Sequence, residues 1–260
     1  MAFLWFAVLV LFAGSSTARP NRIAGGQPTT IDRYPSLVQV EFREYNYMWT
    51  QNCAASLITT RYAISAAQCF DGPSFQLAQR RIRAGTTNRS SGGLVAYVLG
   101  VTYHPSYLSN NYNDGDICVI RLSGNVVFSS VIQPASIVAQ GSVIQESVPV
   151  VHAGWGTTRQ GGPPSAVLHD VEIYTINNTV CAERYAQLGP SYRVTENMIC
   201  AGVLDVGGQG ACEGDNGGPL YYENILIGII SWGYGCGHAS YPRVSTSIAS
   251  YTDWIASTAV

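Results

Sequence analysis

Short segments that alternate between apolar and polar positions recur along the chain. Val38, Val40 and Phe42 alternate with the polar Gln39 and Glu41, which is the period-2 pattern of a strand with one buried face. Clusters of Gly, Pro, Asn and Ser separate such segments. The pattern predicts many short strands joined by turns, and it favours a sandwich or a barrel over a parallel α/β fold.

Two segments depart from this alternation. The apolar run from Ile225 to Ile230 predicts a fully buried strand. At the C-terminus, Val244, Ile248, Tyr251 and Ile255 recur with the spacing of one helix face. Because helical periodicity is scarce elsewhere, the pattern predicts an all-β protein with one terminal helix.

The composition is that of a globular protein without a basic surface. Hydrophobic residues make up 47% of the 260 residues, charged residues make up 12%, and the net charge is -2. No nucleic acid is therefore expected as a partner. The apolar run Met1–Gly14 and the small residues that follow predict a signal peptide over residues 1–18. No later stretch reaches the ~20 apolar residues of a membrane helix, so we expect a secreted, extracellular protein that makes no membrane contact.

The chain carries 7 cysteines, which in an exported protein predicts three disulfides and one free thiol, with the pairing left open by the spacing. Asn88 and Asn177 begin N-glycosylation sequons. All 14 basic residues are arginine. A guanidinium keeps its charge at high pH, which suits an alkaline gut lumen, but compositional drift explains the bias equally well and a body fluid is the alternative compartment.

Five segments match one known family in order and spacing. They are RIAGG at 22–26, AISAAQC at 63–69, GDICVIRL at 115–122, AGWGTT at 153–158, and ACEGDNGGPL at 211–220 followed by SWGYGCG from residue 231. The chain resembles the chymotrypsin and trypsin family of serine proteases, and residues 21–36 are similar to the digestive trypsins of moths and butterflies.

The resemblance implies an all-β fold of two antiparallel six-stranded barrels with a cleft between them and a C-terminal α-helix. It implies a short propeptide over 19–22 and a protease domain over 23–260. Within that domain the barrels are expected at about 23–135 and 136–245, and the helix at about 246–257. The implied disulfides are Cys53–Cys69, Cys181–Cys200 and Cys212–Cys236. Cys118 is left over, and its apolar neighbours predict a buried, unreactive thiol.

The family's catalytic triad is altered at two positions. Gln68 stands before Cys69 where the family has its histidine, and Asn216 stands inside GDNGGP where it has its serine. A carboxamide is neither a base near neutral pH nor a good nucleophile. Asp116 keeps the family's aspartate position. On this ground we expect a protein that is not an enzyme, a non-catalytic homologue of the family.

Other features of the family's site are retained. The backbone N–H groups of Gly214 and Asn216 are expected to form the oxyanion hole, which depends on main-chain geometry. Ser231, Trp232 and Gly233 match the edge strand that pairs with a peptide backbone. An alternative for both features is that the fold alone requires these turns.

Processing and specificity residues can be placed in the same way. Cleavage between Arg22 and Ile23 would free an ammonium group that pairs with Asp215 in this family. In the specificity pocket, Gly210 stands where trypsins have aspartate, and Arg243 stands where most relatives have glycine beside Gly233. Arg243 either blocks the pocket or binds an acidic side chain, an arrangement similar to that of granzyme B.

We expect no cofactor and no metal, since residues 72–113 contain neither Asp nor Glu in the region where calcium-binding relatives place their ligands. The leading hypothesis is a monomeric, catalytically inactive homologue that binds a peptide, an inhibitor or a protease in the old cleft. The alternatives are an endopeptidase with residual or rerouted activity and an abundant secreted protein without catalysis.

Overall fold

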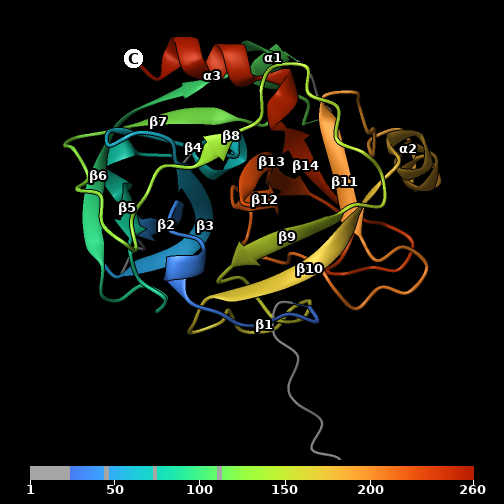
Figure 1. Ribbon diagram of the computed structural model, residues 1–260, viewed down its shortest axis with the longest axis horizontal. Helices are drawn as coiled ribbons and strands as arrows, with labels where there is room; N and C mark the ends of the chain where they lie inside the picture. Colours follow the sequence, from blue (N-terminus) through green and yellow to red (C-terminus); the bar gives the residue numbers. More distant parts are fainter. Residues whose placement is uncertain (1–23, 44–46, 73–74, 110–112) are drawn as a thin grey trace, which may run out of the picture.

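Six strands in the first half of the chain close into an antiparallel barrel in the order β2-β3-β4-β7-β6-β5 (Figure 1). The computed structural model describes residues 24–43, 47–72, 75–109 and 113–260. The predicted signal peptide, propeptide and cleavage site lie outside the described residues. The strands of this barrel are β2 (Leu37–Arg43), β3 (Trp49–Leu57), β4 (Tyr62–Ser65), β5 (Arg80–Ala84), β6 (Leu94–Tyr103) and β7 (Cys118–Leu122).

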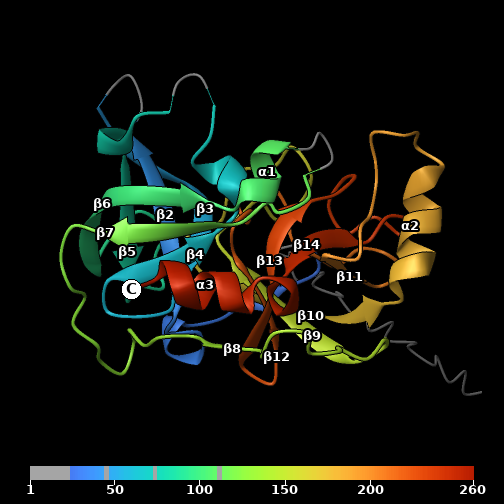
Figure 2. The same ribbon diagram turned by 90° about the horizontal axis from the view of Figure 1, so that it is seen from above.

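The second half of the chain closes a ring of six antiparallel strands in the order β9-β10-β11-β14-β13-β12. Two short strands add to it: β1 pairs with β10 antiparallel, and β8 pairs with β13 in the parallel direction. The prediction of two antiparallel six-stranded barrels is confirmed, and Figure 2 shows them side by side. The strands are β1 (Gln27–Pro28), β8 (Ser136–Ile137), β9 (Pro149–Gly154), β10 (His169–Ile176), β11 (Met198–Gly202), β12 (Pro219–Tyr222), β13 (Ile225–Trp232) and β14 (Arg243–Ser247).

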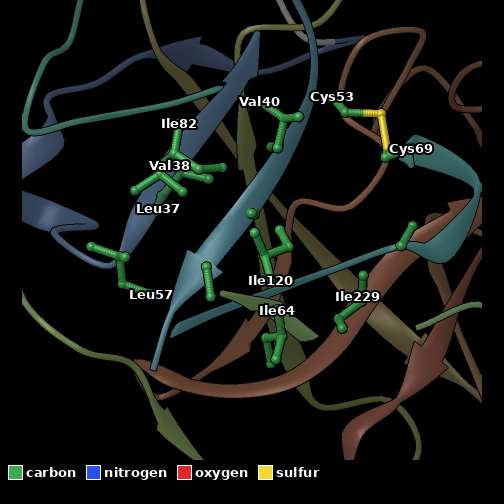
Figure 3. Packing of buried hydrophobic residues seen from close by; sticks show 14 of the residues in the cluster. Leu37, Val38, Val40, Cys53, Leu57, Ile64, Cys69, Ile82, Ile120 and Ile229 are labelled. Atoms are coloured by element: carbon green, nitrogen blue, oxygen red, sulfur yellow. A yellow bond between two sulfur atoms is a disulfide. The ribbon is translucent and has the colours of Figure 1, made fainter. Parts of the chain in front are cut away.

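The largest buried cluster fills the first barrel and continues across the interface between the barrels. Inside the barrel, four side chains are each 0% exposed: Leu37, Ile64, Ile82 and Ile120. Ile229 of β13 packs against this cluster from the second barrel (Figure 3). Removing this apolar surface from water stabilises the arrangement by roughly 25 cal/mol per Å². The shared core fixes the relative position of the two barrels and of the surfaces between them.

The prediction that β2 buries only its apolar face is wrong, because its polar face is buried as well. Gln39 and Glu41 are both 0% exposed. Gln39 donates to the carbonyl of Asn88 at 2.9 Å and accepts from the N–H of Ser90 at 2.7 Å. Glu41 forms ion pairs with two arginines of β5. The loop that carries Asn88 and Ser90 and the neighbouring strand β5 cover this polar face, and hydrogen bonds satisfy its polar groups. The alternation of residues along one strand does not reveal such a cover.

The terminal helix begins later than predicted. Val244 lies within β14, a 3₁₀ turn covers Ile248–Ser250, and α3 covers only Thr252–Thr258. Val244 is held in the sheet because it pairs with Cys200 of β11 and with Trp232 of β13. Ile248, Tyr251 and Ile255 nevertheless pack into the large core. The apolar spacing therefore marks residues that are buried in three successive elements, namely a strand, a 3₁₀ turn and an α-helix.

The remaining helices are short. Two further α-helices are α1 (Pro105–Ser109) and α2 (Asn178–Ala186), and the other 3₁₀ turns cover Ile31–Arg33, Ala67–Cys69 and Leu77–Gln79. The exposed Asn177 caps α2, because its side-chain oxygen accepts from the N–H groups of Thr179 at 2.9 Å and Val180 at 3.3 Å. Asn88 is also exposed, and glycosylation at both positions stays a prediction.

Three disulfides join the pairs that the resemblance implies: Cys53–Cys69, Cys181–Cys200 and Cys212–Cys236. Cys118 is free and buried in β7. Burial raises the pKa of its thiol well above the ordinary value, and the nearby Asp116 carboxylate adds to that shift. The thiol is therefore protonated at neutral pH and is a poor nucleophile.

Candidate functional site

A cleft of about 520 Å³ lies where the two barrels meet. The first barrel contributes Phe42 and Gln68 together with the disulfide Cys53–Cys69. The second barrel contributes the loop that contains Asn216 and the end of β13. The cleft is lined further by Asn52, Gln160, Glu213, Gly214, Ser231, Trp232, Gly233, Gly235, Cys236 and Arg243.

Asp116 lies behind the cleft and is 0% exposed. Its Oδ1 accepts from the backbone N–H of Gln68 at 2.9 Å, and its Oδ2 accepts from Gln68 Nε2 at 2.5 Å and from Ser231 Oγ. Burial raises the pKa of the Asp116 carboxyl, while the hydrogen bonds from Ser231 and Gln68 oppose that shift. The carboxylate thus orients the Gln68 side chain in the way that a triad aspartate orients an imidazole.

A directional chain of hydrogen bonds runs from this carboxylate across the cleft. Gln68 donates to Asp116 at one end of its amide, and its Oε1 accepts from Asn216 Nδ2 at 3.4 Å. Asn216 Oδ1 in turn accepts from Arg243 Nη2. The side-chain amides of Gln68 and Asn216 each donate on the side of the Asp116 carboxylate and accept on the side of the Arg243 guanidinium. The charges of Asp116 and Arg243 therefore hold both amides in one orientation.

The loop from Gly214 to Gly218, called the oxyanion loop below, carries the two residues predicted to form the oxyanion hole. Gly214 and Gly217 have φ of +94° and +80°, which favour glycine. The loop is fixed by a backbone bond from Gly217 N to the carbonyl of Ile230 at 2.8 Å. Within the described part of the chain, the N–H groups of Gly214 and Asn216 donate no hydrogen bond. Two adjacent donors are therefore available to a carbonyl oxygen in the cleft.

The end of β13 borders the same cleft. Ser231, Trp232 and Gly233 all line it. The carbonyl of Ser231 already accepts from Gln68 Nε2 at 3.0 Å. A carbonyl oxygen has a second lone pair, so this edge keeps acceptor capacity for an extended peptide.

The three pocket residues predicted from the sequence are separated. Gly233 and Arg243 line the cleft, whereas Gly210 is buried and does not. The Arg243 side chain lies against Gly233, since a β-carbon at Gly233 would be 3.0 Å from Arg243 Cδ. The cleft therefore ends at a guanidinium instead of opening onto Gly210. Burial lowers the pKa of Arg243, and the nearby Asp215 opposes the shift.

Asp215 lies within the oxyanion loop and is 1% exposed. Its carboxylate accepts from the backbone N–H groups of Gly156 at 2.8 Å and Cys212 at 3.0 Å. Burial raises its pKa to about 6. Ile23, its predicted partner, lies outside the described residues. The next residue, Ala24, accepts from Gly210 N at 3.0 Å, and the pairing of Ile23 with Asp215 stays a prediction.

Sequence reasoning missed several residues that support the site. Gln51 is 2% exposed and donates to the carbonyl of Gly214 at 2.7 Å, so it holds the oxyanion loop from below. Tyr185 of α2 donates to the carbonyl of Pro242 at 2.7 Å and fixes the segment that carries Arg243. His152 is 0% exposed in β9. These residues lie far from the motifs in sequence, and no motif marks them.

The described residues contain one grouping of the side chains that bind metals, namely Cys212, Glu213 and Cys236. The two sulfur atoms form a disulfide, which leaves a single carboxylate as a ligand. No helix in the described part of the chain is long and apolar enough to cross a membrane.

Two barrels with an oxyanion loop and a buried aspartate at their junction define the class of the chymotrypsin-like proteases. A family model described as Trypsin matches residues 23–255. The chain is 39% identical over 255 residues to "Trypsin, alkaline C" of Manduca sexta, covering 97% of this chain and 98% of that protein. It is 36% identical to "Trypsin CFT-1" of Choristoneura fumiferana, covering 96% of both. It is 33% identical to "Vitellin-degrading protease" of Bombyx mori, covering 96% of this chain and 91% of that protein. The chain belongs to the trypsin family.

These comparisons contradict the expectation that the chain is not an enzyme. The relatives that it matches over nearly its whole length are named as trypsins or as a protease. They support classification among the serine endopeptidases. Gln68 and Asn216 are nevertheless the residues at the two altered positions, and any chemistry at this site has to proceed with these side chains.

Proposed function

We propose that the chain binds an extended peptide in the cleft and acts on it as an endopeptidase of the trypsin family, with activity rerouted away from a serine hydroxyl and an imidazole. The observation that carries the proposal is the pair of backbone N–H groups of Gly214 and Asn216, which donate no hydrogen bond and belong to residues that line a cleft bordered by β13. In enzymes of this class, an oxyanion hole and substrate binding alone retain about 10³–10⁴-fold catalysis over water. A peptide, an inhibitor or another protease presents the extended segment that such a cleft accepts.

The proposed step uses hydroxide from solution. The hydroxide oxygen bonds to the peptide carbonyl carbon, and the negative charge moves to the carbonyl oxygen, where the two backbone N–H groups stabilise it. The C–N bond then breaks, and a water molecule protonates the leaving amine and regenerates hydroxide. An alkaline compartment would favour this step. The arginine-only set of basic residues and the word "alkaline" in the names of relatives support such a compartment.

We also propose that the protein is secreted and acts as a monomer. Three disulfides support an oxidising compartment. The apolar run at residues 1–14 supports export by a signal peptide.

The experiment is peptide hydrolysis by the chain cleaved between Arg22 and Ile23, measured against pH and compared with Gly214→Ala. A β-carbon at Gly214 would lie 3.1 Å from Gly156 Cα at a φ of +94°, so this variant displaces the oxyanion loop. We expect the rate to rise tenfold per pH unit without a plateau and to fall about 10²-fold or more in Gly214→Ala. Gly141→Ala is the matched control, because it has a φ of +73° with no atom within 4 Å. Equal rates in Gly214→Ala and the native chain would place hydrolysis outside this cleft.

A further inference from the structure

Several large apolar side chains of the first barrel face solvent. Among the described residues, four of the twelve exposed large hydrophobic side chains lie just before β3 or within β6. They are Tyr47 at 73% exposed, Met48 at 63%, Tyr97 at 54% and Leu99 at 48%. Scattered single residues of this kind are ordinary on a protein surface, whereas a group of them indicates an interaction site.

Strand register brings the two ends of this group together. The strands β3, β2, β5 and β6 are neighbours in the barrel (Figure 1). Trp49 of β3 lies opposite Arg43 of β2, and Arg81 of β5 lies opposite Tyr97 of β6. The rings of Trp49 and Tyr97 meet edge to face with their centroids 6.4 Å apart. We define the arginine–aromatic patch as Arg43, Tyr47, Trp49, Arg81 and Tyr97.

Two guanidinium groups of the patch stack on its aromatic rings. Arg81 Cζ lies 4.3 Å from the centroid of the Trp49 ring, and Arg43 Cζ lies 4.9 Å from that of the Tyr47 ring. A guanidinium that stacks on a ring contacts it with its face, so the N–H groups at its edge stay available to a planar acceptor. Stacking also restricts the side chain before a ligand arrives, which lowers the entropy cost of binding.

The fold does not neutralise the positive charge of the patch. Glu41 is the carboxylate in contact with it, is 0% exposed, and already pairs with two arginines of β5. None of the ion pairs among the described residues includes the exposed Arg43. Glu44 follows it in sequence but lies outside the described residues. Residues 72–113 contain four arginines and neither Asp nor Glu, so this side of the barrel is electrostatically complementary to an acidic partner.

The composition of the patch favours a protein as that partner. Trp, Tyr and Arg are the residues that dominate the binding energy at protein interfaces. The cations of the patch are arginines held against rings, and the chain has no lysine. Donors at fixed positions suit carboxylates at defined places on a polypeptide better than they suit a fluid lipid surface.

We propose that the arginine–aromatic patch is a docking surface for an acidic segment of a partner protein. Carboxylates of the segment pair with the exposed Arg43 and gain from the charge of Arg81, while an apolar side chain of the segment packs on Tyr97. None of the five residues of the patch lines the cleft between the barrels. Docking therefore requires neither the triad positions nor hydrolysis, and it is independent of the proposed function.

The test uses the full chain and three fluorescent decapeptides with a central Tyr, in which Ser alternates with Glu, with Gln or with Lys. Fluorescence anisotropy measures their dissociation constants. We expect the Glu peptide to bind at least about tenfold more tightly than the Gln peptide, and the Lys peptide to bind most weakly. Arg43→Glu should remove this preference. Tyr97→Ser should weaken the Glu and Gln peptides by the same factor, because it removes an apolar contact and no charge.

Two controls separate the patch from the rest of the surface. Arg193→Gln, at an exposed arginine between α2 and β11, should leave all three dissociation constants unchanged. Arg243→Met tests the cleft. A preference for the Glu peptide that is lost in Arg243→Met and kept in Arg43→Glu would place the binding in the cleft and overturn the proposal.

A second arm measures sedimentation of the chain with vesicles of phosphatidylserine and phosphatidylcholine. Sedimentation with these vesicles without a preference for the Glu peptide would identify a lipid surface as the ligand, and the docking proposal would be wrong. Equal binding of the Glu and Gln peptides, or no peptide binding at all, would also overturn it. Because no arm measures hydrolysis, each of these results leaves the proposed endopeptidase activity to its own experiment.

Discussion

Gln68 contacts Asp116 twice, through its backbone N–H at 2.9 Å and through its side-chain amide at 2.5 Å. The carboxylate is fully buried, so both contacts are hydrogen bonds to a charge that has lost its water. The same amide also donates to the carbonyl of Ser231 at 3.0 Å. Gln68 therefore links the two barrels through one side chain, in addition to its place in the cleft.

Gln68→Ala should lower the free energy of unfolding by about 1.5–3 kcal/mol, because it removes a hydrogen bond to a buried charge. Urea unfolding near pH 8 measures the change. Gln187→Ala, at an exposed glutamine after α2, serves as the control and should change stability by less than about 0.5 kcal/mol. Equal stability of Gln68→Ala and the native chain would mean that the contact contributes nothing to the fold.

Gln68→His combined with Asn216→Ser should raise peptide hydrolysis by about 10²-fold or more, because it supplies a general base next to a hydroxyl nucleophile. The expected pH–rate profile reaches a plateau once the imidazole is neutral, unlike the continuous rise expected of the native chain. Asn216→Ser alone should gain less than tenfold, since a serine without a base is a weak nucleophile. A double variant no faster than the native chain would show that the loop does not act as an oxyanion hole.

Two buried groups affect stability in opposite directions as the pH falls. The pKa of His152 is lowered from 6.5 to about 3 by burial. Between these values the unfolded chain binds a proton that the folded chain does not, so stability is lost as the pH drops. The pKa of Asp215 is raised from 3.8 to about 6 by burial. Its contribution is present below pH 3.8 and is lost as the pH rises through 6, so the two effects partly cancel between these values.

His152→Val should remove the loss of stability that His152 causes as the pH falls, and leave the gain that Asp215 causes. Between pH 6 and pH 4, the stability of the variant relative to the native chain should increase by about 1.4 kcal/mol for each unit that the pH falls. Urea unfolding at several pH values measures this slope. His238→Val, at an exposed histidine, serves as the control for the loss of an imidazole. Parallel curves for His152→Val would mean that His152 titrates normally in the fold.

Strand patterning predicts an all-β protein of many short strands, whereas the two barrels, the disulfide pairs and the residues at the triad positions follow from the family resemblance that the five motifs carry. The sequence leaves Arg243 with two alternatives, since whether a long side chain fills a pocket depends on the neighbours that hold it. Those neighbours, Asn216 and Gly233, lie on other segments. His152 gives no signal at all, because a single histidine in the apolar strand PVVHAG resembles any core position.

The final prediction concerns the buried polar face of β2. Glu41 is 0% exposed and contacts Arg83 Nε at 2.7 Å and Arg81 Nε at 2.5 Å. Arg83 is only 8% exposed and also donates to the carbonyl of Gly92. Glu41→Gln would leave this guanidinium buried without a counter-charge, so we expect a loss of about 3–5 kcal/mol in the free energy of unfolding.

The matched control for Glu41→Gln is Asp205→Asn, which removes the acidic partner from an ion pair with Arg184 at the surface. Asp205 has a φ of +62°, a conformation that asparagine also tolerates. Since a solvated pair contributes little, the control should lose less than about 1 kcal/mol. Unfolding in urea at pH 8 compares the two variants. A Glu41→Gln loss as small as that of the control would mean that water or a shifted side chain replaces the carboxylate, and that the polar face of β2 is less tightly covered than its burial indicates.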